Sequence, residues 1–444
     1  GQHLNCYGEE SVDSPNLDRF AESGVLFENA FCSSPCCSPS RGCAMSGMHA
    51  HTNGLMGLVN RGWSMPESTP TIVDYFNEGG YETAHFGFQH ERYVASANRY
   101  QVEGAPDYPE EDWVNRQEDW VEPAIDGAIG YLESRVGAER PFYLNVGTVE
   151  VHASRWQGMF PEGHPQNRSD TYGVAAPEDV DVPPWLPDTR AQRERLGKFQ
   201  GAIRYLDGHV QRLLDAIDRL GYAEDTLVIF TTDHGIAEQR AKVWLYDRGV
   251  EIALLVRLPG RVQRREGALR PGIRISHLIQ NIDIAPTLLD AAGLPIPEVL
   301  QGRSFWSLLT GERYTPHDAI VIERNHHGDY DPMRAVRTPR YHYIRNFAPP
   351  PRKTWLQSTT YLYSDFEPWY GQFDPLPGAP RPEEELFDVV GDPYEYVNLA
   401  DDPEYAAVRR ELAAYLSDWQ VETDDLLLYG PIPDKLNPWP EEEV

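Results

Sequence analysis

The strongest constraint on the fold of this chain is the alternation of short apolar runs with amphipathic segments through its first 315 residues. The runs at 142–146, 226–230 and 251–257 have the length and composition of buried strands. Residues 190–220 instead carry apolar side chains at helical spacing and stop at Gly221. Buried strands that alternate with helices predict an α/β fold, in which helices cover a parallel sheet.

Helix-starting and helix-stopping residues bound further elements of this region. Pro15 stands at the first position of an expected helix, and Gly24 stops it. Further helices are expected at 71–77 and 283–292, and a further strand at 81–87.

The pattern changes after about residue 315. A strand is expected at 319–323, followed by a hairpin of 333–338 with 341–347. Residues 348–382 are rich in Pro and aromatic side chains and predict an irregular surface segment, after which 384–388 and a helix at 404–419 close the chain. We therefore expect two domains: a catalytic α/β domain over 1–315 and a smaller antiparallel α+β domain over 316–444.

The charge balance excludes some classes of partner. The 444 residues include 39 Lys+Arg and 69 Asp+Glu, which gives a formal charge of −30. A general nucleic-acid binder needs a basic surface, so nucleic acid is not an expected partner. No stretch approaches the roughly 18 apolar residues of a membrane span, so a membrane is not expected either. The compartment is left open, because the first residues form neither a signal peptide nor a start methionine.

Two segments of the chain carry residue types suited to chemistry. Cys37 begins the run Cys-Ser-Pro-Ser-Arg, where a loop is expected to turn into a helix whose positive end favours an anion and a nucleophile. An ordinary cysteine at a helix start is the alternative from this pentapeptide alone. Asp233 and His234 follow an expected strand, where a carboxylate and an imidazole can bind a divalent cation. All five cysteines lie in the first 43 residues, so a cysteine-rich metal site and one disulfide are further alternatives.

The segment from Cys37 to Gly47 resembles the signature of the type I sulfatases, C-x-P-S-R followed by a small residue and Gly. The resemblance extends along nearly the whole chain, through residues 5–8, 14–18, 24–31, 225–235, 283–289, 385–388 and 398–400. It implies an alkaline-phosphatase-like fold: a mixed, mostly parallel sheet between helices, with a smaller C-terminal domain. It also implies that the cysteine is oxidised to formylglycine by a formylglycine-generating enzyme, and that the aldehyde hydrate is the nucleophile.

Within this family the chain is most similar to the heparan N-sulfatases, or sulfamidases. The similar segments are residues 51–58, 325–327, 332–336 and 419–424. The implied activity is hydrolysis of a sulfuric ester or sulfamate on a small sulfated saccharide such as N-sulfoglucosamine. Because the chain is acidic, a short saccharide end is a better substrate for it than a long anionic polymer.

The resemblance also assigns further residues to the site. Arg41 would stabilise the nucleophilic oxygen, and His90 would lie near the second hydroxyl of the hydrate when that hydroxyl loses its proton. Lys242 and His152 would bind the sulfate and assist the leaving group, while His327 matches a substrate-pocket histidine of the sulfamidases.

One position departs from the family pattern. Phe88 stands where the family has a sulfate-binding lysine, and the nearby Arg92 could compensate for that loss.

The implied metal ligands are Asp233, His234 and the modified Cys37. Ca²⁺ is the expected ion, but the family often has Asn at position 234, so the histidine leaves Mn²⁺, Mg²⁺ and Zn²⁺ open. Two further carboxylates belong, in the family, to a strand that would lie before Gly1. We therefore expect that strand and its ligands to be missing from this sequence.

Two other functions are compatible with these residues. His234 and Phe88 permit a phosphonate monoester or phosphodiester hydrolase of the same superfamily. The missing ligands and Phe88 also permit a catalytically silent protein that binds acidic glycans.

Overall fold

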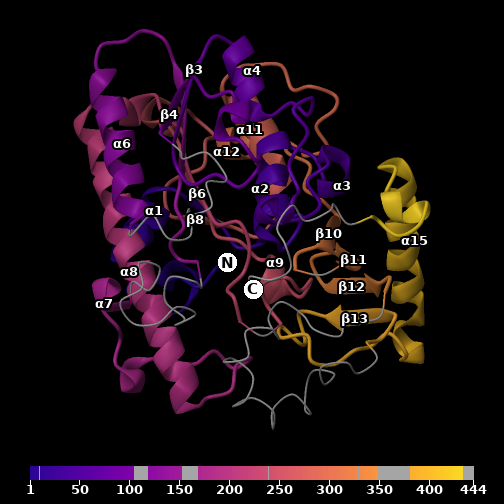
Figure 1. Cartoon of the computed structure of the whole chain (residues 1–444). Coiled ribbons are helices and arrows are strands. Elements are labelled where there is room, and N and C mark those ends of the chain that lie inside the picture. The colour runs from indigo at the N-terminus through magenta and orange to yellow at the C-terminus, as the bar shows by residue number, and fades with distance from the viewer. Residues whose placement is uncertain are drawn as a thin grey trace.

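A computed structural model describes residues 1–9, 11–104, 119–152, 169–238, 240–328, 330–348 and 381–433. It shows an α/β body followed by a four-stranded antiparallel sheet (Figure 1). The irregular segment expected at 348–382 lies almost entirely outside the described residues. Among the described residues, no helix has both the length and the apolar character needed to cross a membrane.

Among the described residues, three sheets belong to the α/β body. One has the order β6-β7-β1-β8, a second has the order β4-β3-β5, and β2 pairs with β9. The pairs β3–β4, β3–β5, β1–β8 and β2–β9 are parallel, whereas β7 runs antiparallel to both β1 and β6. The strands are β1 (Val25–Phe27), β2 (Ala30–Phe31), β3 (Glu82–Gly87), β4 (Val102–Gly104), β5 (Phe142–Gly147), β6 (Val228–Thr231), β7 (Leu254–Arg257), β8 (Ile273–Ile275) and β9 (Ile279–Gln280).

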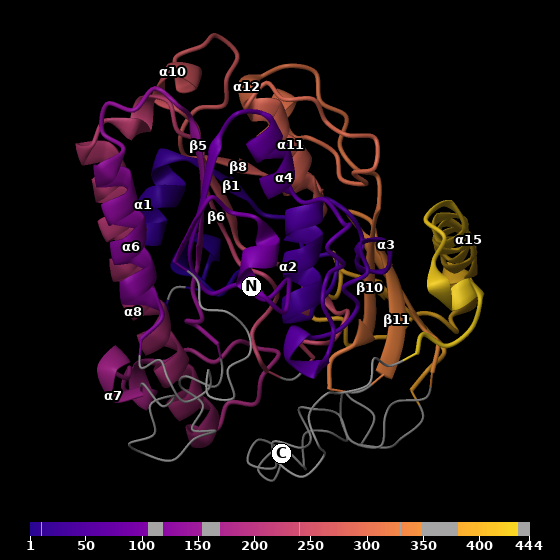
Figure 2. The same cartoon turned by 45° about the horizontal axis from the view of Figure 1, so that its top comes forward.

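Helices cover this body on two sides. The long helices α6 and α8 run side by side along one flank, and α2, α4 and α11 lie on the other (Figures 1 and 2). Each covering helix buries an apolar face, as Leu17, Phe20 and Ala21 do in α1. The helices are α1 (Pro15–Ser23), α2 (Cys37–Ser46), α3 (Ala50–Asn53), α4 (Ile72–Glu78), α6 (Val121–Ser134), α7 (Ser169–Tyr172), α8 (Arg190–Arg219), α9 (Asp247–Val250), α10 (Gly260–Gln263), α11 (Ile284–Ala291) and α12 (Trp306–Thr310).

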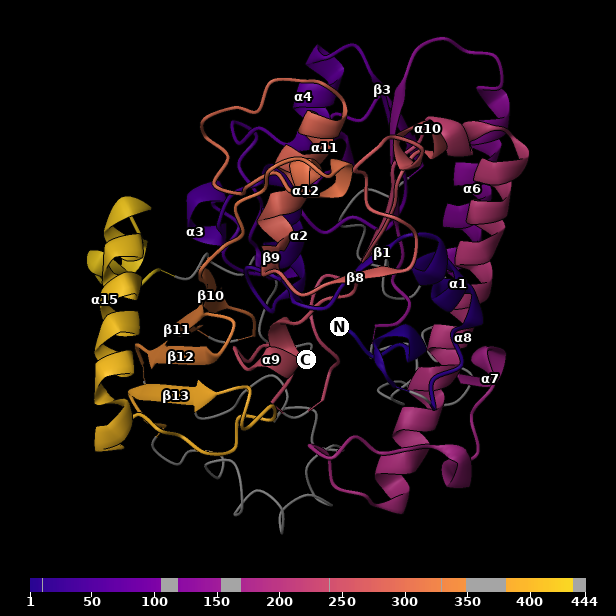
Figure 3. The ribbon, with the colours of Figure 1, turned by 180° about the vertical axis from the view of Figure 1, so that it is seen from behind.

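The C-terminal part is an antiparallel sheet with one helix on its outer face. The sheet has the order β10-β11-β12-β13, and α15 (Ala406–Glu422) lies against it (Figure 3). Leu412, Leu416 and Trp419 of the helix bury their side chains against the sheet. The strands are β10 (Ile320–His326), β11 (Tyr330–Arg337), β12 (Tyr341–Asn346) and β13 (Glu384–Asp388). The hairpin expected from the sequence is β11 with β12.

A cavity of about 1250 Å³ lies between two of the sheets. Every residue of β5 and of β6 lines it, so these edge strands of two sheets both border the cavity. The carboxyl ends of both strands also reach it, with Thr148 to His152 after β5 and Thr232 to Ile236 after β6. Because ligands of open α/β sheets bind at the carboxyl ends of strands, this end of the cavity is the natural place for a site.

Candidate active site around Cys37

Cys37 is the first residue of α2, and its side chain is only 7% exposed. The preceding residue, Cys36, has an extended backbone, so the chain turns into the helix at Cys37 as the sequence predicts. The positive end of the helix dipole therefore points toward the sulfur. All five cysteines are free thiols, so the disulfide considered from the sequence does not form.

Cationic and imidazole groups surround the sulfur. The Sγ atom of Cys37 lies 3.2 Å from Nε2 of His234, and Nζ of Lys242 lies 3.3 Å from Nε2 of His152. Burial alone would raise the pKa of Cys37, but Lys242, His234 and His152 together hold this pKa well below its ordinary value. The pocket is therefore built to stabilise negative charge at position 37.

Asp233, His234 and Cys37 form a set of donors that fits a divalent cation. One ligand atom of each lies within 4.8 Å of the other two. The remaining ring nitrogen of His234 lies 2.8 Å from the carbonyl oxygen of Gly235, which orients the imidazole. A carboxylate with an imidazole suits a borderline metal as well as an oxygen-seeking one, so the donors alone do not select Ca²⁺.

A buried asparagine fixes α2 against this strand end. Asn281 donates to the backbone oxygen of Ser40 at 2.9 Å, and its own oxygen accepts from the hydroxyl of Ser33 at 2.8 Å. Ser40 in turn donates to the carbonyl of Asp233. Asn281 thus fixes both the loop before α2 and α2 itself. Through Ser40, the helix in turn fixes the backbone of Asp233, which is a candidate metal ligand. Sequence reasoning missed Asn281, because it lies about 240 residues away in the chain.

Arg41 lies one helical turn after Cys37, and the carboxylate of Glu91 balances part of its charge. Its Nε atom lies 2.9 Å from a carboxylate oxygen of Glu91, and it also donates to the carbonyl of Phe88 at 3.0 Å. The other oxygen of Glu91 accepts from the backbone amide of His90 at 2.8 Å. Although burial alone would raise the pKa of Glu91, Arg41 lowers it. Glu91 was missed from the sequence and acts here as the orienting partner of Arg41.

Phe88, which is expected from the sequence to replace a lysine of the family, covers Arg41. Its ring centre lies 5.3 Å from the guanidinium of Arg41 and 5.2 Å from the ring of His90. His90 lines the same cavity as Cys37 and is 6% exposed.

The expectation that Arg92 compensates for the lost lysine is wrong. The guanidinium of Arg92 donates to the backbone carbonyls of Thr69 (2.6 Å), Pro66 (3.3 Å) and Ala97. Arg92 is 1% exposed, and these bonds direct its charge into the loops instead of the cavity.

His327 joins the site from the C-terminal sheet. It follows the last residue of β10, is 4% exposed and lines the cavity with Cys37. Burial lowers the pKa of His327 to about 3, although its hydrogen bond with Cys37 opposes this shift. The imidazole is therefore neutral near pH 7 and can serve as a hydrogen-bonding group. The structure thus brings Cys37, His152, His234, Lys242 and His327 together.

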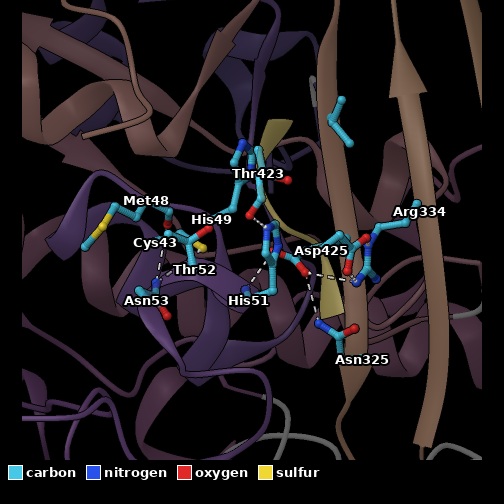
Figure 4. Close-up of polar contacts among 12 residues, drawn as sticks. Cys43, Met48, His49, His51, Thr52, Asn53, Asn325, Arg334, Thr423 and Asp425 are labelled. Atoms are coloured by element: carbon cyan, nitrogen blue, oxygen red, sulfur yellow. Dashed lines mark hydrogen bonds and ion pairs between the residues drawn. The ribbon is translucent and has the colours of Figure 1, made fainter. Parts of the chain in front are cut away.

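A second buried polar cluster lies behind the site. Glu323 accepts from the ring nitrogen Nδ1 of His51 at 3.0 Å and from Asn325 at 3.0 Å. Arg334 makes two parallel hydrogen bonds of 2.8 Å to Asp425 (Figure 4). Both charges of that pair are fully buried. These four charged groups connect α3, the C-terminal sheet and the segment after α15.

Comparison with known proteins places the chain in a family. A family model described as Sulfatase matches residues 1–294, so the chain belongs to the sulfatase family. The chain is therefore an enzyme of the class that hydrolyses sulfuric esters.

Individual proteins agree with this assignment. The human N-sulphoglucosamine sulphohydrolase is 28% identical over 491 aligned positions, covering 99% of this chain and 92% of the human protein. A solved 2-O GAG sulfatase aligns with a TM-score of 0.70 at 22% identity, covering 98% of this chain and 92% of that one. A phosphonate monoester hydrolase from Silicibacter pomeroyi aligns with a TM-score of 0.66 at 18% identity, covering 95% and 93%. At these identities the two structures show a shared fold alone, and they confirm the predicted fold class.

Proposed function

We propose that this enzyme hydrolyses the sulfate ester or sulfamate of a small sulfated saccharide, of which N-sulfoglucosamine is the first candidate. The observation that carries the proposal is the setting of Cys37, at a helix start and within reach of His234, Lys242 and His152. Such a pocket stabilises the negative charge that develops on the oxygens of a transferring sulfuryl group. The similarity to the human N-sulphoglucosamine sulphohydrolase supports the choice of saccharide.

Cys37 would act after oxidation to formylglycine by a formylglycine-generating enzyme. The hydrated aldehyde supplies two hydroxyls on one carbon, one to attack sulfur and one to release the sulfate. Lys242 and His152, 3.3 Å apart, would hold the sulfate oxygens, and His152 would pass a proton to the departing oxygen or nitrogen. Arg41 would stabilise the attacking oxygen, and His90 would take the proton of the second hydroxyl.

Asp233 and His234 would hold a divalent cation together with residue 37, and the ion would supply positive charge at the nucleophile. Ca²⁺ is the first candidate, with Mn²⁺, Mg²⁺ and Zn²⁺ to be compared. Chelation followed by add-back of each ion, read as activity and as thermal midpoint, assigns it. A full return of both readouts with one ion alone identifies the resident metal.

Mass spectrometry of the peptide that carries residue 37 tests the nucleophile. Formylglycine lowers the peptide mass by about 18 units relative to cysteine. An unchanged mass in active protein would refute the formylglycine mechanism.

A panel of an aryl sulfate, N-sulfoglucosamine and an aryl phosphonate tests the reaction class. We expect turnover of the sulfated substrates, fastest for N-sulfoglucosamine. A phosphonate hydrolase is the second candidate, because Phe88 replaces a sulfate-binding lysine and Arg92 does not compensate for it. Preference for the phosphonate in this panel would favour that candidate.

A further inference from the structure

A short 3-10 turn, η2 (Val59–Arg61), is fixed beside the nucleophile. The backbone amide of Val59 donates to the hydroxyl of Ser38 at 3.0 Å, and Ser38 is the neighbour of Cys37. The other end of the turn is followed by Trp63, which is 2% exposed and packs with its ring centre 5.0 Å from that of His326. The turn is therefore clamped between α2 and the strand end that carries His327.

Two side chains of this turn line the cavity, namely Asn60 and Arg61. Five other arginines line it. Arg41, Arg135 and Arg261 each form an ion pair with a carboxylate. Arg140 donates to the carbonyls of Gly80 and Tyr81, and Arg265 is exposed to solvent. No carboxylate among the described residues lies within ion-pairing distance of Arg61. Arg61 is half-buried, so its charge is partly withdrawn from solvent without an acidic partner beside it.

Asn60 provides a second, independent sign of a ligand. Its side-chain oxygen is buried and has no hydrogen-bond partner among the described residues. A buried acceptor without a donor destabilises the folded protein, and a ligand hydroxyl would supply the missing hydrogen bond.

We propose that Asn60 and Arg61 form a subsite for a second anionic group on the substrate, either a carboxylate or a second sulfate, and for a neighbouring hydroxyl. This inference rests on the proposed function, because it assumes that the scissile sulfate lies at Cys37. A guanidinium binds a carboxylate or a sulfate through two parallel hydrogen bonds, which makes Arg61 the specificity-determining contact. The enzyme would therefore select saccharides that carry more than one negative group.

Binding to the catalytically inactive Cys37→Ala protein tests the subsite separately from turnover. Three ligands are compared by calorimetry. They are glucosamine N-sulfate (N-sulfoglucosamine), glucosamine N,6-O-disulfate, and glucosamine N-sulfate linked to a uronate. We expect the doubly anionic ligands to bind roughly 10- to 100-fold more tightly than glucosamine N-sulfate. The second and third ligands distinguish a sulfate from a carboxylate as the recognised group.

Substitutions in the same Cys37→Ala background assign the preference to the turn. Arg61→Met should abolish it, Arg61→Lys should keep part of it, and Asn60→Asp should oppose it through like charge. Exposed Arg313 is the matched control, and Arg313→Met should leave the preference intact. Equal binding of all ligands, or a preference that survives Arg61→Met, would overturn the subsite.

Turnover by the protein with Cys37 intact separates the two proposals. Turnover of glucosamine N,6-O-disulfate and of the uronate-linked substrate with a KM that Arg61→Met leaves unchanged refutes the subsite alone. An Arg61-dependent preference in a protein that hydrolyses no sulfated substrate refutes the proposed function and leaves the subsite.

Discussion

Two buried polar clusters of this molecule differ in how their charges are balanced. In the cluster behind the site, Arg334 and His51 face the carboxylates of Asp425 and Glu323 at hydrogen-bonding distance. Although burial opposes both shifts, these partners lower the pKa of Glu323 and raise that of His51, which favours the charged form of both groups. Around Cys37, one lysine and three histidines surround a single thiol, with Asp233 as the nearby carboxylate.

The difference separates a structural role from a binding role. A buried cluster whose positive and negative charges match each other needs nothing from outside, and its loss destabilises the fold. A pocket with an excess of positive and donor groups is complete only with an anion or an oxyanion in it. The first cluster should therefore control stability, and the second should control turnover.

The largest effect is expected at Cys37. Cys37→Ala should lower kcat/KM roughly 10⁴-fold or more, because no nucleophile remains, while Cys37→Ser should give at most a stalled, sulfated enzyme. The thermal midpoint should hardly change in either variant. Steady-state kinetics with N-sulfoglucosamine and thermal melts check both statements, and full multiple-turnover activity in Cys37→Ala would end this account.

Arg334 provides the opposite test. Arg334→Met leaves Asp425 buried and unpaired, so the free energy of unfolding should fall by about 3–5 kcal/mol. Denaturant titration measures this loss. The control is Arg340→Met, which breaks an ion pair with Asp388 whose arginine is 60% exposed. Because solvent screens this pair, the control should lower the free energy of unfolding far less than Arg334→Met does. Equal losses in the two variants would contradict the structural role of the cluster.

Lys242 should affect turnover but not stability. Lys242→Met removes the cation nearest to Cys37 and His152, and kcat/KM should fall about 10²- to 10³-fold. Lys198, on the long helix α8, is the matched control, and Lys198→Met should leave kinetics unchanged. A wild-type rate in Lys242→Met would remove this lysine from the mechanism.

A smaller effect is expected from pH at a third buried cluster. His342 lies 2.6 Å from Glu395 and 3.2 Å from Asp247; burial alone would lower its pKa, but the two carboxylates raise it to about 9. Because the pKa of His342 is higher in the folded than in the unfolded protein, its protonated form stabilises the fold. This stabilisation is complete below pH 6.5, the pKa of an unfolded histidine, and it disappears as pH rises through 9. Stability should therefore fall by roughly 3 kcal/mol between these limits. His342→Gln should flatten this slope in chemical denaturation at several pH values, and an unaltered slope would contradict the assignment.

Those helices and strands that a local residue pattern determines could be predicted from the sequence. The helix expected at 190–220 is α8 (Arg190–Arg219), because apolar spacing and a terminal glycine both mark it. The strand expected at 251–257 was too long: β7 begins only at Leu254, and Glu251 forms a single bridge to Phe31.

Contacts between distant segments could not be predicted. Asn281, Glu91 and the pair of Arg334 with Asp425 carry no periodic signal, and each finds its partner only after the chain has folded. At Arg92 the sequence predicted too much. Its nearness in sequence to the site suggested that it binds the substrate, but its guanidinium is directed into the neighbouring loops.

Burial of the Arg334–Asp425 pair has a consequence for behaviour in brine. Dissolved ions screen charges that they can approach, with a screening distance of about 3 Å at 1 M salt. Exposed pairs such as Arg190 with Glu194 should lose their attraction there, whereas a pair without water contact keeps it. High salinity should therefore weaken the exposed ion pairs of this acidic protein before it weakens the buried pair at the junction between the catalytic body and its C-terminal sheet.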